Sequence, residues 1–265
     1  MQILSKTNKI ILSEMVRTDY KLRYQNSVLG YLWSLLRPLM LSFILYVVFA
    51  KFLGIKGDIR HYISYLLLGI MCWTFFIEVT TGAVSAVVAK GDLIRKISIP
   101  RYLIVLSSSA SAIINFGLNI VVLSGIMLIT GVEIKVQYLI LVPLLLIQLY
   151  SFALALAFFL SASFVKYRDV AFVWEVFSQM LFYLTPIIYP IGLVLSKYEI
   201  GKLLLLSPVA QTIQDLRYIL VTPQSQTAWH LIGWLTLIPL TLTFLLLIIS
   251  VQYFRQQSKT FAENV

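Results

Sequence analysis

Six long apolar stretches run through this sequence, and they constrain its fold more than any other feature. Their approximate bounds are 28–53, 62–89, 102–130, 138–165, 170–190 and 228–254. A helix of about 20 apolar residues spans the hydrocarbon core of a lipid bilayer. The sequence therefore predicts an all-α integral membrane protein, a single domain over residues 1–265 with six transmembrane helices.

The composition is typical of a protein whose solvent is a membrane. Hydrophobic residues make up 60% of the chain and charged residues 12%, whereas soluble domains are about a quarter charged. A net charge of +10 in a soluble protein would suggest a nucleic-acid partner. Here the cations lie between apolar stretches, where they orient a membrane protein. We therefore expect membrane lipids, and no nucleic acid, as partners.

The N-terminal segment differs in character from the apolar stretches. It has no short apolar region followed by a cleavage site, so it does not read as a secretory signal peptide. Residues 1–27 instead alternate apolar and basic side chains at a loosely helical spacing. We predict an amphipathic interface helix in the lipid head-group layer; an unstructured basic tail is the alternative.

The region between the fifth and sixth stretches, residues 191–222, is apolar only in short runs. These runs are too short to cross a bilayer, and polar residues and Pro208 interrupt them. Segments of this kind are typical of re-entrant helices, which survive at membrane depth only where protein or water covers them. We predict a re-entrant region here that shapes one end of a cavity.

The lysines and arginines predict the orientation of the chain. About two thirds of the 21 basic residues lie in the N-terminal region, in two short bridges (90–101 and 166–169) and in the C-terminal tail. Cytoplasmic segments carry this excess in membrane proteins. Both termini are therefore predicted to be cytoplasmic.

The first of these bridges, residues 90–101, is here called the coupling segment. It alternates cations with large aliphatic side chains, so a short helix would present one charged and one apolar side. We predict that it docks a motor protein on the cytoplasmic side; a loop that only fixes topology is the alternative. The predicted docking residues are Asp92, Leu93, Ile94, Arg95, Lys96, Ile97, Pro100 and Arg101.

Catalytic and metal-binding patterns are not found in the sequence. The phosphate-cradling pattern G-x-x-x-x-G-K-[ST] is absent, so the chain cannot bind ATP in that manner. The histidines His61 and His230 lie far apart in sequence, and Cys72 is a lone cysteine, so no metal site is predicted. The acids are scattered singly, and no catalytic residue is predicted. Two intramembrane acids, Glu78 and Glu175, could form a proton relay or hydrogen-bond a neighbouring helix.

Polar and aromatic side chains inside the apolar stretches carry the remaining signals. Asn115 and Asn119 share a helix face and are predicted to hydrogen-bond across a helix contact. Aromatic side chains in the first and fifth stretches either face lipid or line a passage, where their rings would stack on sugars. The predicted conduit residues are Phe43, Tyr46, Phe49, Phe177, Phe182, Tyr183 and Tyr189.

Several motifs together resemble one family. They are Lys21-Leu22-Arg23-Tyr24, Leu29-Gly30-Tyr31-Leu32-Trp33, Leu36-Arg37-Pro38-Leu39, Tyr167-Arg168-Asp169, Thr185-Pro186-Ile187-Ile188-Tyr189-Pro190 and Ser207-Pro208-Val209-Ala210-Gln211. With the coupling segment, they are similar to the membrane subunits of ABC-2 type polysaccharide exporters, and the similarity covers nearly the whole chain.

The resemblance implies an assembly in the bacterial plasma membrane. Two copies of this chain would pair with two copies of a separate ABC ATPase, which would hold ATP and magnesium, so this chain would carry no cofactor. The coupling segment would sit in a groove of the ATPase. The first and fifth spans would line a conduit between the two copies, and residues 191–222 would form its outer gate.

The resemblance also implies a cargo. This would be a lipid-linked glycan such as O-antigen, teichoic acid, capsule or a rhamnose-rich wall polysaccharide. Arg23 and Arg37, with Arg101 a further candidate, would attract its pyrophosphate. The alternatives are an exporter of drugs or small lipids, a membrane-bound transferase, and an ion-coupled carrier. A transferase would need a cluster of acids, and a carrier would need internal repeats and more intramembrane charge.

Overall fold

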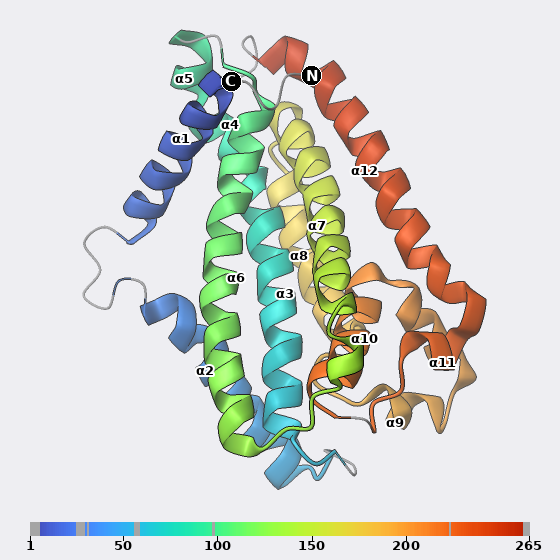
Figure 1. Cartoon of the computed structure of the whole chain (residues 1–265). Helices are drawn as coiled ribbons and strands as arrows, with labels where there is room; N and C mark the ends of the chain where they lie inside the picture. The colour runs from blue at the N-terminus through green and yellow to red at the C-terminus, as the bar shows by residue number, and fades with distance from the viewer. Residues whose placement is uncertain are drawn as a thin grey trace.

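The computed structural model describes residues 6–24, 30, 32–55, 59–96, 99–222 and 224–261, and all regular secondary structure in them is helical (Figure 1). The long apolar helices are α2 (Leu32–Leu45), continued by a π-helical segment (Tyr46–Phe52), α3 (Tyr62–Val84), α6 (Tyr102–Thr130), α7 (Leu141–Lys166), α8 (Val170–Leu184) and α12 (Leu237–Gln257). The other helices are α1 (Lys6–Tyr24), α4 (Ala86–Ala89), α5 (Gly91–Lys96), α9 (Ile191–Leu195), α10 (Pro208–Leu220) and α11 (Ala228–Ile232). Short 3₁₀ turns cover Val136–Tyr138, Glu199–Leu206, Gly233–Thr236 and Ser258–Thr260.

Five helical segments in the described part of the chain are long and apolar enough to cross a membrane. They are Leu32–Phe52, Tyr62–Val84, Tyr102–Thr130, Leu141–Lys166 and Ala228–Thr260. These segments confirm an all-α membrane protein that crosses the bilayer several times. Helix α8 is apolar but has only 15 residues, about 22 Å of helix at 1.5 Å per residue.

The predicted fifth span, 170–190, is therefore too long. Helix α8 ends at Leu184, and Thr185 is extended, with a ψ of 132°. Thr185 precedes Pro186, whose ring clashes with a helical conformation of the preceding residue. The predicted sixth span is also interrupted, because Gly233 adopts a φ of +54°, a conformation that glycine tolerates best.

Other predicted boundaries shift by a few residues or divide. The predicted span 62–89 breaks at Ser85, between α3 and α4. The predicted spans 102–130 and 138–165 correspond to α6 and α7. The coupling segment is helical only over Gly91–Lys96, with residues 97 and 98 outside the described part of the chain.

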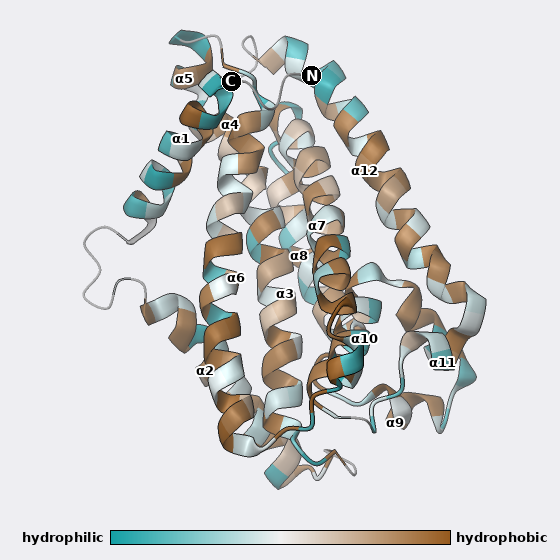
Figure 2. Ribbon diagram, viewed as in Figure 1, coloured by the Kyte–Doolittle hydropathy of each residue, from teal (hydrophilic) through white to brown (hydrophobic). Residues whose placement is uncertain are grey.

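Helix α3 forms the centre of the bundle. It lies behind α6 and α7 in Figure 1. In its most apolar stretch 78% of the residues are buried, whereas the figure for Leu32–Phe52 is 11%. Figure 2 shows hydrophobic residues along α3, α6, α7 and α12, and hydrophilic residues concentrated in α1, in α5 and at the C-terminal end of α12. These polar elements lie together at one end of the bundle (Figure 1). The outer helices therefore present apolar surface to lipid, as a membrane protein requires.

Hydrogen bonds between helices confirm the prediction for the third span. Asn115 Nδ2 donates to Glu78 Oε2 at 3.0 Å, which joins α6 to α3. Asn119 Nδ2 donates to the carbonyl oxygen of Ser34 at 3.2 Å, which joins α6 to α2. Of the two roles open to Glu78, the hydrogen bond to a neighbouring helix is the one that the structure has.

A buried arginine holds the other end of the bundle together. Arg217 of α10 is fully buried. Its guanidinium donates to the carbonyl oxygens of Tyr65 (3.2 Å), Pro186 (2.6 Å) and Ile187 (2.6 Å). Its Cζ also lies 3.5 Å from the centroid of the Tyr65 ring. One side chain thus connects α10, α3 and the turn after α8.

Gly69 makes room for this side chain. A Cβ at position 69 would lie 2.5 Å from Nη2 of Arg217, too close for any real contact. Gly82 lies on the same helix, but a Cβ there would meet nothing within 4 Å. The two glycines therefore offer a matched pair of positions for substitution by alanine, one crowded and one open.

Replacing Gly69 by alanine is expected to destabilise the protein, because the new Cβ would push the guanidinium off its carbonyl partners. A lost hydrogen bond to a charged group costs roughly 1.5–3 kcal/mol, and a drop of several degrees in the melting temperature is expected in detergent. Gly82→Ala is the control and should melt like the wild type. Equal melting temperatures of the two variants would contradict the packing assigned to Gly69.

Candidate functional site

A groove of about 710 Å³ lies between α2, α3 and α8. It combines aromatic rings with a cation, an acid and an amide, and it is here called the α2–α8 groove. Its lining residues are Arg37, Trp73, Ile77, Thr81, Val84, Ser85, Ala171, Trp174, Glu175, Ser178, Gln179, Phe182 and Tyr183.

The groove brings together three residues predicted from the sequence. Arg37 comes from α2, and Phe182 and Tyr183 come from the last turn of α8. The Phe182 ring packs on Trp73, with the ring centroids 5.7 Å apart, whereas Tyr183 is 71% exposed. A basic group predicted to attract phosphate and two predicted conduit rings thus share one surface.

The other predicted conduit rings do not line the groove. Phe43 is exposed on α2, and Phe177 is half exposed on α8, with its ring centroid 6.2 Å from that of Trp174. Tyr46 packs near Tyr62, with the ring centroids 6.4 Å apart.

Two further predicted rings have contacts within this chain. Phe49 packs against the hydrophobic core. The Tyr189 hydroxyl donates to the carbonyl oxygens of Tyr183 and Leu184, both at 3.2 Å, at the end of α8. The side chain of Arg23 lies outside the described residues.

Two groove residues were missed from the sequence. Trp73 and Trp174 lie within apolar stretches, where a tryptophan reads as a lipid contact or as part of an interfacial belt. The Trp174 indole Nε1 is buried and has no hydrogen-bond partner among the described residues, although Trp174 lines the groove. A buried donor usually has a partner, so Trp174 Nε1 is an exception among the described residues.

The groove has the chemistry to hold phosphate and sugar groups. A guanidinium such as that of Arg37 recognises phosphate through paired hydrogen bonds. Amphipathic rings offer an apolar face for stacking and, in Tyr and Trp, a polar group for hydrogen bonding. Glu175, predicted as an intramembrane acid, adds a carboxylate to the same lining.

The coupling segment lies at the polar end of the bundle, and this chain covers part of its apolar side. Ile94 is buried, and Leu93 is half-buried against the same core, so Ile94 is covered by this chain itself, and docking of a partner by the segment stays a prediction. Asp92, Arg95 and Lys96 are exposed, and they form the part of α5 open to another protein.

The remaining predicted docking residues lie near the end of the segment. Pro100 and Arg101 are half-buried, and the Arg101 guanidinium donates to the carbonyl oxygen of Ser258 at the end of α12. Ile97 lies outside the described residues. Arg101 is thus engaged by the C-terminal end of this chain.

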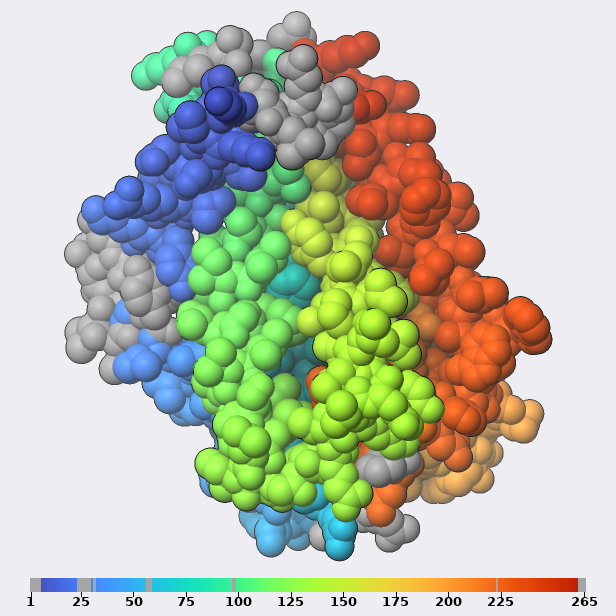
Figure 3. Space-filling view, viewed as in Figure 1, coloured from blue at the N-terminus to red at the C-terminus, as the bar shows by residue number. Residues whose placement is uncertain are grey.

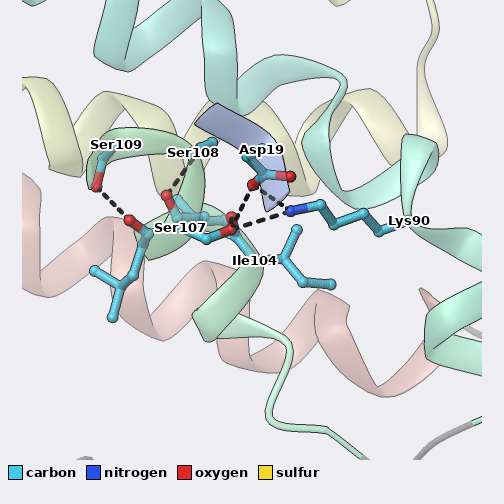
Figure 4. Close-up of polar contacts among 8 residues, drawn as sticks. Asp19, Lys90, Ile104, Ser107, Ser108 and Ser109 are labelled. Atoms are coloured by element: carbon cyan, nitrogen blue, oxygen red, sulfur yellow. Dashed lines mark hydrogen bonds and ion pairs between the residues drawn. The ribbon is translucent and has the colours of Figure 1, made fainter. Parts of the chain in front are cut away.

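A polar network ties the coupling segment to α1 and α6 (Figure 4). Lys90 Nζ lies 2.5 Å from Asp19 Oδ2 of α1 and 3.1 Å from Ser107 Oγ of α6. Ser107 Oγ also lies 3.2 Å from Asp19 Oδ2. The ion pair is about three-quarters buried, since the two side chains are 21% and 24% exposed. Three segments far apart in sequence therefore meet at one point.

An apolar crevice opens between α6 and α7. Figure 3 shows it between the two green helices, with α3 at its floor. Its volume is about 470 Å³, and its lining is almost wholly aliphatic and aromatic, which suits contact with a lipid chain. Within the described part of the chain, no group of three or more His, Cys, Asp or Glu residues could hold a metal ion.

Comparison with known proteins agrees with this architecture. Residues 12–221 match the ABC-2 type transporter family. An O-antigen export system permease protein RfbA from Klebsiella pneumoniae is 25% identical over 96% of this chain and 94% of its own length. A second RfbA from the same organism is 27% identical over 71% of this chain and 72% of its own length. The RfbA of Myxococcus xanthus is 24% identical over 79% of each chain.

Two adjacent serines on α6 test the network of Figure 4. Ser107→Ala removes a group that contacts both Lys90 and Asp19, and a lost hydrogen bond to a charged group costs roughly 1.5–3 kcal/mol. Amide hydrogens of α1 are therefore expected to exchange at least tenfold faster, as measured by mass spectrometry. Ser108 Oγ donates only to the Val105 carbonyl oxygen, so Ser108→Ala should leave α1 unchanged. Unchanged exchange in Ser107→Ala would show that the network does not anchor α1.

Proposed function

The chain belongs to the ABC-2 type transporter family, and on this premise we propose that it is the membrane-spanning permease of an ATP-driven exporter of lipid-linked polysaccharide. The observation that carries the cargo assignment is the α2–α8 groove, where Arg37, Glu175 and Trp174 share a lining with other aromatic rings. The related O-antigen export permeases, which match this chain over most of its length, support the same cargo class.

The energy would come from a partner. The sequence has no phosphate-cradling loop, so a separate ABC ATPase would bind ATP and magnesium and hydrolyse the nucleotide. Two copies of the ATPase would pair with two copies of this chain. This chain would bind no cofactor and carry no catalytic residue; its role would be to provide the pathway and the gate.

We place six crossings in the bilayer, with α8 as the short fifth crossing. Helices α9 and α10 would be re-entrant, because α10 has 13 residues, about 20 Å of helix, and folds back onto α3 through Arg217. The polar helix α1 would lie in the head-group layer. Helix α1, helix α5 and the end of α12 lie at the same end of the bundle (Figure 1). This arrangement supports cytoplasmic placement of both termini.

The two copies would face each other across their α2–α8 grooves. Both helices have exposed apolar surfaces, and closing two grooves against one another would make a conduit shielded from lipid. The pyrophosphate of the cargo would meet Arg37, and the sugars would pass along Phe182, Tyr183 and the indole of Trp174. Stacking on flat rings holds a sugar through a broad contact, which suits passage of a polymer.

Motion would enter through the coupling segment. Closure of the ATPase pair on ATP would press on the exposed residues of α5, which lies in the chain between α4 and α6. The ion pair of Lys90 with Asp19 would carry this displacement to α1, and α3 and α6 would move as rigid levers. The re-entrant helices at the opposite end would then open or close the outer gate.

Export of drugs or small lipids is the second candidate function, and it is not favoured. A drug site is mostly apolar with few polar groups, whereas the α2–α8 groove carries a cation, an acid, an amide and a buried indole N–H.

Reversing the charge of Arg37 should reduce export at least tenfold. Arg37→Glu would add a second acid to a groove that already contains Glu175, and both would repel a pyrophosphate. Export is measured as surface glycan in cells depleted of the native permease. Lys51→Glu, on the π-helical continuation of α2 and outside the groove lining, is the control. Normal export by a correctly inserted Arg37→Glu variant would remove Arg37 from the entrance.

Exposed cations of α5 test the contact with the ATPase. The double variant Arg95→Glu/Lys96→Glu should lower the permease-dependent ATPase rate in proteoliposomes several-fold, because it reverses the charge of the surface that faces the partner. These two side chains are preferred to Ile94, since an acid at that buried position would break the fold itself. Lys259→Glu, an exposed cation at the C-terminal end, serves as control. An unchanged ATPase rate in the double variant would show that these cations of α5 do not contact the ATPase and that the segment only fixes the topology of the chain.

A further inference from the structure

A second cavity lies at the end of the bundle opposite the coupling segment. Its volume is about 450 Å³, and α7, α10, α11 and α12 enclose it. Figure 1 places α10, α11 and the start of α7 at the lower end, away from α1 and α5. We call it the α7–α12 cavity; neither the groove nor the coupling segment shares a residue with it.

One side of the cavity is apolar. Leucines of α7 and α12 form this wall, among them Leu144 and Leu240, and both are more than half exposed. In a membrane protein such exposure means contact with lipid, so the cavity opens toward acyl chains. A lipid can therefore enter it sideways from the bilayer.

The other side carries a carboxylate that is only partly engaged. Asp215 Oδ1 accepts a hydrogen bond from the Ala228 backbone N–H at 2.7 Å, whereas Oδ2 has no partner among the described residues. Asp215 is half-buried in this lining, and a carboxylate withdrawn from water is disfavoured without a cation beside it. A cationic ligand would offset this desolvation.

Two aromatic rings share the lining with the carboxylate. They belong to Tyr218 and Trp229, and an ammonium group is attracted to the face of such a ring. Lys135 is not itself in the lining, but its Nζ lies 3.4 Å from the centroid of the Tyr218 ring, so one cation adjoins a ring of the cavity. The Thr236 hydroxyl is buried in the lining without a hydrogen-bond partner among the described residues. Tyr138 and His230 are the remaining titratable groups in the lining.

We propose that the α7–α12 cavity binds a phospholipid with a primary-amine head group from the adjacent leaflet. The ammonium lies between Asp215 and the rings of Tyr218 and Trp229, the phosphate faces Lys135, and one acyl chain follows the leucine wall. This arrangement matches each charge of a zwitterionic head group with its opposite. Such a lipid would brace the re-entrant helix α10 against α7 and α12, whatever cargo the α2–α8 groove carries.

The test uses the purified full-length chain in detergent at pH 7.5, with native mass spectrometry to count bound lipids. Phosphatidylethanolamine, phosphatidylcholine and phosphatidylglycerol are added separately. The wild type is expected to bind the ethanolamine lipid at least fivefold more tightly than the other two. Asp215→Asn removes the charge but keeps an oxygen for the Ala228 N–H, and it should abolish this preference. Glu133→Gln, an exposed acid outside the cavity, should retain it.

A second variant tests the acyl-chain wall without touching the charges. Leu144→Trp should lower binding of the ethanolamine lipid several-fold by filling the cavity, whereas Leu245→Trp, exposed on α12 outside the lining, should not. If Asp215→Asn fails to fold, the two tryptophan variants decide the matter. Equal binding of all three lipids, tighter binding of the anionic lipid, or binding unaffected by Leu144→Trp would overturn the proposal.

Discussion

The burial of one cation, Arg217, fixes the half of this molecule that lies away from the coupling segment. A guanidinium stays charged inside an apolar bundle. Its N–H groups therefore need hydrogen-bond acceptors, because burying an unpaired charge costs a large amount of free energy. Backbone carbonyls supply them, from Tyr65 on α3 and from the turn after α8. The carbonyls of Pro186 and Ile187 are free to accept because α8 ends before Pro186. The early end of α8, which Pro186 sets, the glycine at position 69 and the position of α10 therefore all serve a single contact.

The same logic separates the molecule into two working ends around α3. At one end, the largely buried ion pair of Lys90 and Asp19 joins the coupling segment to α1, and Ser107 joins both to α6. At the other end, Arg217 attaches α10 to α3. Because α3 contacts both ends and is buried along most of its length, a displacement at one end has a rigid path to the other. Residues of α3 line the α2–α8 groove, so the proposed shift of α3 would change its shape.

Much of the fold could be predicted because hydrophobic length is a local property of the chain. Helix α6 was predicted with its observed bounds. A hydrogen bond from Asn115 to a neighbouring helix was also predicted, although not its partner. Ile94 was assigned to a partner because an amphipathic pattern indicates that a side is covered but not by what. Trp174 was missed because a tryptophan in an apolar stretch resembles a lipid contact. Arg217 was noted only as a polar interruption, since its partners are backbone carbonyls 30 or more residues away and carry no sequence signal.

The central claim is that cargo passes along the α2–α8 groove. The most direct measurement replaces Tyr183 by photoreactive benzoylphenylalanine in the assembled transporter and illuminates it while cells export glycan. Tyr183 is 71% exposed in the groove, and Phe244, 64% exposed on α12, is the comparison position. The account predicts a glycan-dependent crosslink at 183 that disappears when glycan synthesis is blocked, and none at 244. A crosslink at 244 without one at 183 would contradict it.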